Sequence, residues 1–173
     1  MKIEKTTAYL SFALVVITIF WQREQIMETI SNGVKYLGSR GIRNNNPGNI
    51  EKSKTTVWQG QSPAAEQTDP RFLKFVSADY GIRALTRVLD NYKKLHKITT
   101  IQGIIERWAP GKDGNNVAAY VAAVSRGVGK GANVPLDFSA DMPKLVAAII
   151  KHENGTQPYS TELIQRGIFM ARG

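Results

Sequence analysis

The chain has 173 residues and a formal net charge of +9, from 23 lysines and arginines against 14 aspartates and glutamates. It contains no cysteine, which excludes disulfides, thiol nucleophiles and cysteine metal sites. The length suits one domain with a hydrophobic core plus an appendage, and the positive charge favours an anionic partner such as nucleic acid, a membrane surface or an acidic cell envelope.

The N-terminal segment, residues 6–22 (TTAYLSFALVVITIFWQ), carries no charge and ends in aromatic residues. Its length is near the lower limit for a membrane-spanning helix, and aromatic residues are typical of membrane interfaces. We expect a transmembrane anchor here rather than a buried core helix or a cleavable signal peptide. Lys2 and Lys5 favour an N-terminus inside the cytoplasm, with the rest of the chain outside the cytoplasmic membrane. The other expected location of the anchor is a virion membrane. A weak, reversible anchor is the alternative.

Residues 23–39 carry apolar side chains every three or four positions, which is typical of an amphipathic helix. We interpret them as a stalk, so that residues 1–39 form the anchor and stalk and residues 40–173 form the soluble domain.

The soluble domain opens with a strong turn signal, RNNNPGN (residues 43–49), in which Pro47 and Gly48 suit the centre of a type II turn with Gly48 at positive φ. Residues 56–76, with isolated aromatics, predict short strands or an irregular lobe. The remaining pattern is helical and predicts a mainly α domain. Helices are expected over residues 77–95, 99–108 (capped at Thr99), 115–126 (followed by Gly127), 142–153 (stopped at Gly155) and 160–171 (capped at Ser160).

Several chemistries are excluded by the residues that the chain lacks. Its two histidines, His96 and His152, and the lack of an H-E-x-x-H motif make a catalytic zinc site improbable. No G-x-S-x-G motif is present, and no helix-turn-helix or RNA-binding signature occurs. We therefore expect no metal, no cofactor and no nucleic acid. Acid/base work by carboxylates remains, or no catalysis at all.

Glu153, in the segment IIKHENG (residues 149–155), is the main candidate for such work. A carboxylate is disfavoured at a helix C-terminus, and helical spacing from Val146 and Ile149 points this one toward the apolar face. Desolvation and the helix dipole both disfavour the ionised form, which suits a proton donor. A partly exposed glutamate bonded to nearby backbone NH groups is the equal alternative. No second carboxylate stands out among Glu51, Asp69, Asp79 and Asp113.

Several segments resemble a family of lysozyme-like phage and prophage proteins, described as virion structural proteins or as peptidoglycan-degrading enzymes. They cover nearly all of residues 40–173 and read RGIRNNNPGNI (40–50), DPRFLKF (69–75), YGIRAL (80–85), WAP (108–110), NNVAAYVAAV (115–124) and HENGTQPY (152–159). The resemblance implies a mainly α (α+β) lysozyme-like fold. WAP and NNVAAYVAAV are similar to the later half of lytic transglycosylases, in which the catalytic glutamate ends an earlier helix. Here HENG comes last, which suggests a permuted order and keeps Glu51 as the second candidate.

The function implied is a membrane-anchored phage glycosidase that cleaves the MurNAc–GlcNAc bond of peptidoglycan. A lytic transglycosylase needs a single acid/base glutamate, because the muramic acid's own hydroxyl attacks, whereas a muramidase needs a second carboxylate. The alternative is a non-catalytic virion protein that binds membrane or cell wall. Partners would be glycan strands, and the membrane through residues 6–22. Catalysis is assigned to Glu153 (second candidate Glu51), and substrate binding to Asn44, Asn45, Asn46, Trp58, Trp108, Asn116 and Tyr120.

Overall fold

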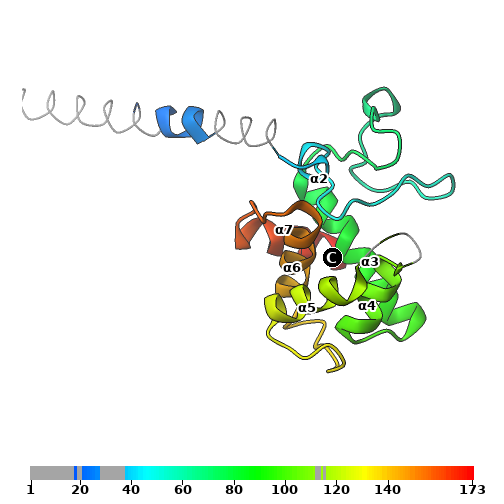
Figure 1. Ribbon diagram of the computed structural model, residues 1–173. Helices are drawn as coiled ribbons and strands as arrows, with labels where there is room; N and C mark the ends of the chain where they lie inside the picture. The colour runs from blue at the N-terminus through cyan, green and yellow to red at the C-terminus, as the bar shows by residue number, and fades with distance from the viewer. Residues whose placement is uncertain (1–17, 19–20, 28–37, 112–113, 115) are drawn as a thin grey trace, which may run out of the picture. The chain divides into compact units, whose positions relative to one another are not determined.

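The computed structural model describes residue 18 and residues 21–27, 38–111, 114 and 116–173. The chain divides into two compact units, Met1–Gly38 and Ser39–Gly173. In the first unit, residues 21–27 are helical. The second unit carries the helices labelled in Figure 1 and a short 3-10 turn. Their bounds are α2 (Arg40–Arg43), η1 (Ala64–Glu66), α3 (Ala78–His96), α4 (Ile101–Trp108), α5 (Val117–Val128), α6 (Met142–Asn154) and α7 (Thr161–Arg172).

The prediction of a membrane anchor needs correction. In the part of the chain that the structure describes, no helix combines the length and the apolar character that crossing a bilayer requires. In the residues that it describes, the structure therefore contradicts the transmembrane helix predicted over residues 6–22 and the membrane-anchored location that followed from it. Apart from residues 18, 21 and 22, that segment lies outside the described residues, as do residues 28–37 of the predicted stalk.

The prediction of a mainly α domain is confirmed, and the helix ends agree to within a few residues. The expected cap at Ser160 accepts a hydrogen bond from the backbone NH of Leu163. The cap of α4 is Thr100 rather than Thr99. Helix α5 continues through Gly127, which had been predicted to follow its end. A Cβ atom at position 127 would lie 2.7 Å from Cβ of Ala148 on α6. The glycine thus serves a close helix–helix approach.

The main hydrophobic core lies between two helix pairs. Helix α3 packs mainly against α7, and α5 packs mainly against α6. The apolar face of α3 (Ile82, Leu85 and Leu89) is fully buried in this core. In a smaller cluster, Leu73 and Phe75 of the segment that links α2 to α3 are buried together with Ala84 of α3.

The segment between α2 and α3 is an irregular lobe, drawn from cyan to green in Figure 1. Among the described residues it forms isolated antiparallel bridges rather than strands, for example between Glu51 and Phe72. Side-chain amides bond the backbone groups that a strand ladder would use. Asn46 Nδ2 donates to the carbonyls of Ile50 and Leu73. Gln67 Nε2 donates to the carbonyls of Ser62 and Lys74. These side-chain hydrogen bonds stabilise the lobe, as backbone hydrogen bonds between strands would stabilise a sheet.

The NNNPGN turn differs from the predicted type II geometry. Gly48 is not at positive φ, whereas Asn45 (51°) and Asn49 (49°) are. Asparagine is among the few residues other than glycine that adopt this conformation readily. Gly48 is instead required by crowding, since a Cβ atom there would lie 3.3 Å from both Leu85 and Trp108.

Candidate active site

A cleft of about 370 Å³ opens on the second unit, and Glu153 lies in its wall. The C-terminal end of α4, one face of α3, the chain after the NNNPGN turn and the Arg71–Phe72 pair supply the rest of the lining. Three aromatic side chains, Phe72, Tyr92 and Trp108, take part in it. The cleft therefore combines a carboxylate with flat apolar surfaces, as sugar-binding sites do.

Three side chains from three parts of the chain hold the carboxylate of Glu153. Trp108 Nε1 donates to Oε1 at 3.0 Å, and the Tyr120 hydroxyl donates to the same oxygen at 2.8 Å. Asn49 Nδ2 donates to Oε2 at 2.9 Å. With donors on both oxygens, the carboxylate plane is fixed in the cleft wall.

Local structure explains how these donors meet. Glu153 lies in the last turn of α6, which ends at Gly155 in the left-handed conformation (φ 71°). Trp108 is the last residue of α4, and Tyr120 lies in the first turn of α5. Asn49 is placed by its own positive φ and by the bond from its backbone NH to the Asn46 carbonyl. The donors thus stand at element ends, where side chains can converge.

The end of α6 is also tied to the NNNPGN turn. Asn154 Nδ2 donates to the Pro47 carbonyl at 2.7 Å and to the Ile150 carbonyl at 2.8 Å. The hydroxyl of Ser39, the N-cap of α2, donates to Asn154 Oδ1. The two segments singled out in the sequence, HENG and NNNPGN, are therefore one structural unit around Glu153.

Tyr120 is buried, with 3% of its surface exposed. Burial raises the pKa of its hydroxyl well above the ordinary value, and the charge and hydrogen bond of Glu153 act in the same direction. Tyr120 thus remains a phenol and keeps its proton for Glu153. The ring of His152 stacks on it, with centroids 3.5 Å apart and planes at 18°. Burial lowers the pKa of His152 against the opposing effect of Glu153, which favours the neutral form of this ring.

Glu51 lines the same cleft in a different environment. Its side chain is 57% exposed and accepts from Arg71 Nε at 2.8 Å. The structure thus brings both candidate carboxylates to one cleft, Glu153 held by neutral donors and Glu51 held by a cation.

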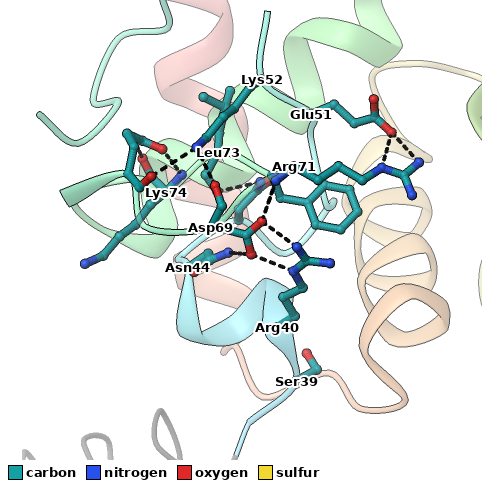
Figure 2. Close-up of polar contacts among 12 residues, drawn as sticks. Ser39, Arg40, Asn44, Glu51, Lys52, Asp69, Arg71, Leu73 and Lys74 are labelled. Atoms are coloured by element: carbon teal, nitrogen blue, oxygen red, sulfur yellow. Dashed lines mark hydrogen bonds and ion pairs between the residues drawn. The ribbon is translucent and has the colours of Figure 1, made fainter. Parts of the chain in front are cut away.

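Asp69 organises the lobe beside the cleft, and Figure 2 shows its carboxylate at the centre of a cluster of donors. Arg40 of α2 bonds both of its oxygens, and Asn44 Nδ2 donates to Oδ2 at 2.9 Å. The backbone NH groups of Arg71 and Phe72 donate to Oδ1. These bonds, that from Arg40 foremost, hold the pKa of Asp69 far below its usual range. Asp69 is a structural carboxylate.

Comparison with known proteins adds one relationship. No model of a known protein family matches the chain. Protein P5 of Pseudoalteromonas phage PM2 is 35% identical over 131 residues, which cover 75% of this chain and 79% of that protein. The chain belongs to the Protein P5 family. The predicted relation to bacteriophage proteins is confirmed at this level, and the name Protein P5 states no activity or substrate.

In this P5-family chain, five of the residues predicted to bind substrate make hydrogen bonds or packing contacts with parts of the chain other than Glu153. The structure brings Trp108 and Tyr120 to Glu153, but the three asparagines hold the lobe. Asn44 bonds Asp69, Asn45 donates to the Phe75 carbonyl, and Asn46 is fully buried. Trp58 packs on the small core cluster, and Asn116 caps α5 by accepting from the NH of Ala119. These contacts indicate structural roles for all five.

Sequence reasoning missed Asn49, which directly contacts the candidate acid. It also missed Arg71, Phe72 and Tyr92 in the cleft lining. The signal for Asn49 was its residue type in a turn, since asparagine adopts positive φ more readily than most residues. Asp113 lies outside the described residues, and Asp79 pairs with Arg166 of α7 at 2.6 Å. Within the described residues, no group of three or more His, Asp and Glu side chains could hold a metal ion.

Proposed function

We propose that the cleft is the active site of a phage peptidoglycan-cleaving glycosidase, in which Glu153 is the acid/base of a lytic transglycosylase reaction. The observation that carries the proposal is the fixed carboxylate of Glu153, held by Asn49, Trp108 and Tyr120 in the wall of an aromatic cleft. Holding a side chain in one geometry against side-chain entropy is what acid/base catalysis requires, and a solvated surface glutamate needs no such contacts.

The hydrogen bonds suggest which oxygen transfers the proton. Oε1 already accepts from both Trp108 and Tyr120, whereas Oε2 accepts from Asn49. An ionised carboxylate offers about four lone-pair sites, two on each oxygen. Oε2 therefore has a site left for substrate. In the proposed reaction Glu153 starts in its protonated form and gives the proton on Oε2 to the glycosidic oxygen. The resulting carboxylate then takes a proton from the muramic acid hydroxyl that attacks the anomeric carbon. The bond to the leaving sugar breaks as the internal ether forms, so that no water is consumed.

The state of Glu51 favours transglycosylation over hydrolysis. A hydrolase needs a second carboxylate that acts as base or nucleophile. Glu51 is more than half exposed, and its carboxylate already accepts from the guanidinium of Arg71, so it is not poised to act on a bound glycan. A reaction that uses Glu153 alone avoids this difficulty.

The test is product analysis. The full chain is incubated with purified peptidoglycan, and released muropeptides are identified by mass spectrometry, with Glu153→Gln as the control. Anhydro-muropeptides absent from the control are the expected result. Hydrated products would replace the transglycosylase by a muramidase. If intact peptidoglycan is recovered with both proteins, the catalytic proposal is rejected.

A non-catalytic phage protein that binds glycan strands in the same cleft is the second candidate. It is favoured by the three neutral donors on Glu153, which would hold a carboxylate equally well as a fixed hydrogen-bond acceptor for sugar hydroxyls. Under this alternative, the wild-type chain sediments with peptidoglycan and releases no muropeptides.

A further inference from the structure

The Arg71–Glu51 pair at the cleft has no evident structural purpose. Both side chains are exposed, Arg71 by 62% and Glu51 by 57%, and pairs of this kind contribute little to stability. Both residues line the cleft that contains Glu153. An ion pair of low structural value in a cleft of this kind calls for a ligand-based explanation.

The geometry of the pair leaves it open to exchange. Arg71 donates through Nε and Nη2 to a single oxygen, Oε1 of Glu51. In the strongest arginine–carboxylate pairs, two parallel N–H groups reach two different oxygens. Figure 2 shows the Arg71 side chain extending away from the Asp69 cluster toward Glu51. A better-placed carboxylate could therefore take the place of Glu51.

Phe72 and the backbone hold Arg71 in position. The guanidinium carbon of Arg71 lies 5.1 Å from the centre of the Phe72 ring, and that of Arg40 lies 4.6 Å from the same centre. Arg40 is committed to the buried Asp69. The backbone of Arg71 is fixed by bonds to Asp69 and from Lys52. Of the two arginines on this ring, Arg71 is the one whose partner is exposed.

We propose that Arg71 is a specificity residue that binds a carboxylate carried by the substituents of the glycan strand, displacing Glu51. This inference rests on the proposed function, because it assumes that a glycan lies in the cleft. Peptidoglycan offers two such carboxylates, the free carboxyl groups of its stem peptides and the lactyl carboxyl that remains when the peptide is removed. Both present the planar two-oxygen group that a guanidinium fork matches.

The experiment compares soluble glycan fragments of equal length with the full chain. One carries stem peptides with free carboxyl groups, a second carries the same peptides as carboxamides, and a third has its peptides removed. Arg71→Ala is expected to lower kcat/KM roughly tenfold or more on the free-carboxyl fragment, mainly through KM, and less than twofold on the carboxamide. Arg71→Lys should recover part of the loss. An equal loss on the peptide-free fragment shows that the lactyl carboxyl is bound as well, and no loss there assigns the stem peptide alone.

A matched control separates specificity from general charge. Arg166 is 58% exposed, pairs with Asp79, and is not among the cleft-lining residues. Arg166→Ala removes the same charge and should leave the ratio of the free-carboxyl to carboxamide rates unchanged. Equal losses on the free-carboxyl and carboxamide fragments in Arg71→Ala, or no loss on either, would overturn the inference.

The inference can fail separately from the proposed function. If the wild-type chain cleaves no fragment, the catalytic proposal fails, and the dissociation constants of the fragments decide the role of Arg71. Tighter binding of the free-carboxyl or lactyl fragment than of the carboxamide, lost in Arg71→Ala, supports the carboxylate site. Equal binding of all three rejects it.

Discussion

The hydroxyl of Tyr120, in the first turn of α5, donates a 2.8 Å hydrogen bond to Oε1 of Glu153, in the last turn of α6. The sequence separation of these residues is 33, and neither position alone indicates the contact. With Trp108 and Asn49 it converts a glutamate at an electrostatically unfavourable helix end into a fixed group in a cleft.

Glu153→Gln should abolish peptidoglycan cleavage without unfolding the protein. Loss of the acid/base group is expected to lower turnover by roughly a hundredfold or more. The glutamine Oε1 can still accept from Trp108 and Tyr120. Asn49 can turn its amide to face the new NH₂ group, because its Oδ1 is buried and has no hydrogen-bond partner in the described residues. Turnover on sacculi and thermal unfolding are measured together. Full retained activity would remove Glu153 from the mechanism.

Tyr120→Phe should reduce activity while preserving the stack on His152. Loss of one donor to a charged group is expected to cost about 2 kcal/mol of unfolding free energy and to slow turnover by ten- to a hundredfold, by order of magnitude, as Glu153 loses its fixed position. Tyr159→Phe is a matched control, since the Tyr159 hydroxyl is buried and has no hydrogen-bond partner within the described part of the chain. If both variants keep wild-type turnover, the Tyr120 hydroxyl has no positioning role.

Asn49→Ala and Asn49→Gly separate backbone strain from the hydrogen bond to Glu153. Alanine at φ 49° costs about 1–2 kcal/mol in strain, a cost that glycine avoids. Both variants lose the bond to Oε2. We expect urea unfolding to show Asn49→Ala as the less stable of the two, and turnover to fall similarly in both. Wild-type turnover in Asn49→Gly would show that this bond is dispensable.

Asp69 should make folding stability sensitive to acid. Its folded-state pKa is depressed, chiefly by Arg40. The stabilisation is therefore fully present above the unfolded-state pKa, about 4, and is lost as pH falls below it. Asp69→Asn should lose about 2 kcal/mol at neutral pH and show a shallower decline in unfolding free energy between about pH 5 and 2. Urea titrations across that range measure both. Parallel declines in the two proteins would assign the acid sensitivity to other groups.

Local patterns determined most of the secondary structure. The apolar spacing of α3, the cap at Ser160 and the stop at Gly155 depend on residues within one or two turns, so the sequence predicts the helices well. Where an end was misplaced, a distant partner decided it, as when Ala148 required a glycine inside α5 at position 127. The apolar run at residues 6–22 shows the opposite failure, since hydropathy and length alone predicted a membrane helix that the described residues do not contain.

The composition of the candidate site was determined only in part by the sequence. Elimination of other chemistries and the phase of α6 led to Glu153 from the sequence alone. Its partners could not be found in this way, because Asn49, Trp108 and Tyr120 are separated along the chain and meet only when α4, α5, α6 and the NNNPGN turn pack together. The same packing assigned Asn44, Asn45 and Asn46 to the lobe, where their amides bond other groups of the chain and where Asn46 is fully buried. Residue types and helices thus follow from short-range physics, while the roles of polar side chains are decided by which distant groups the tertiary structure leaves for them to bond.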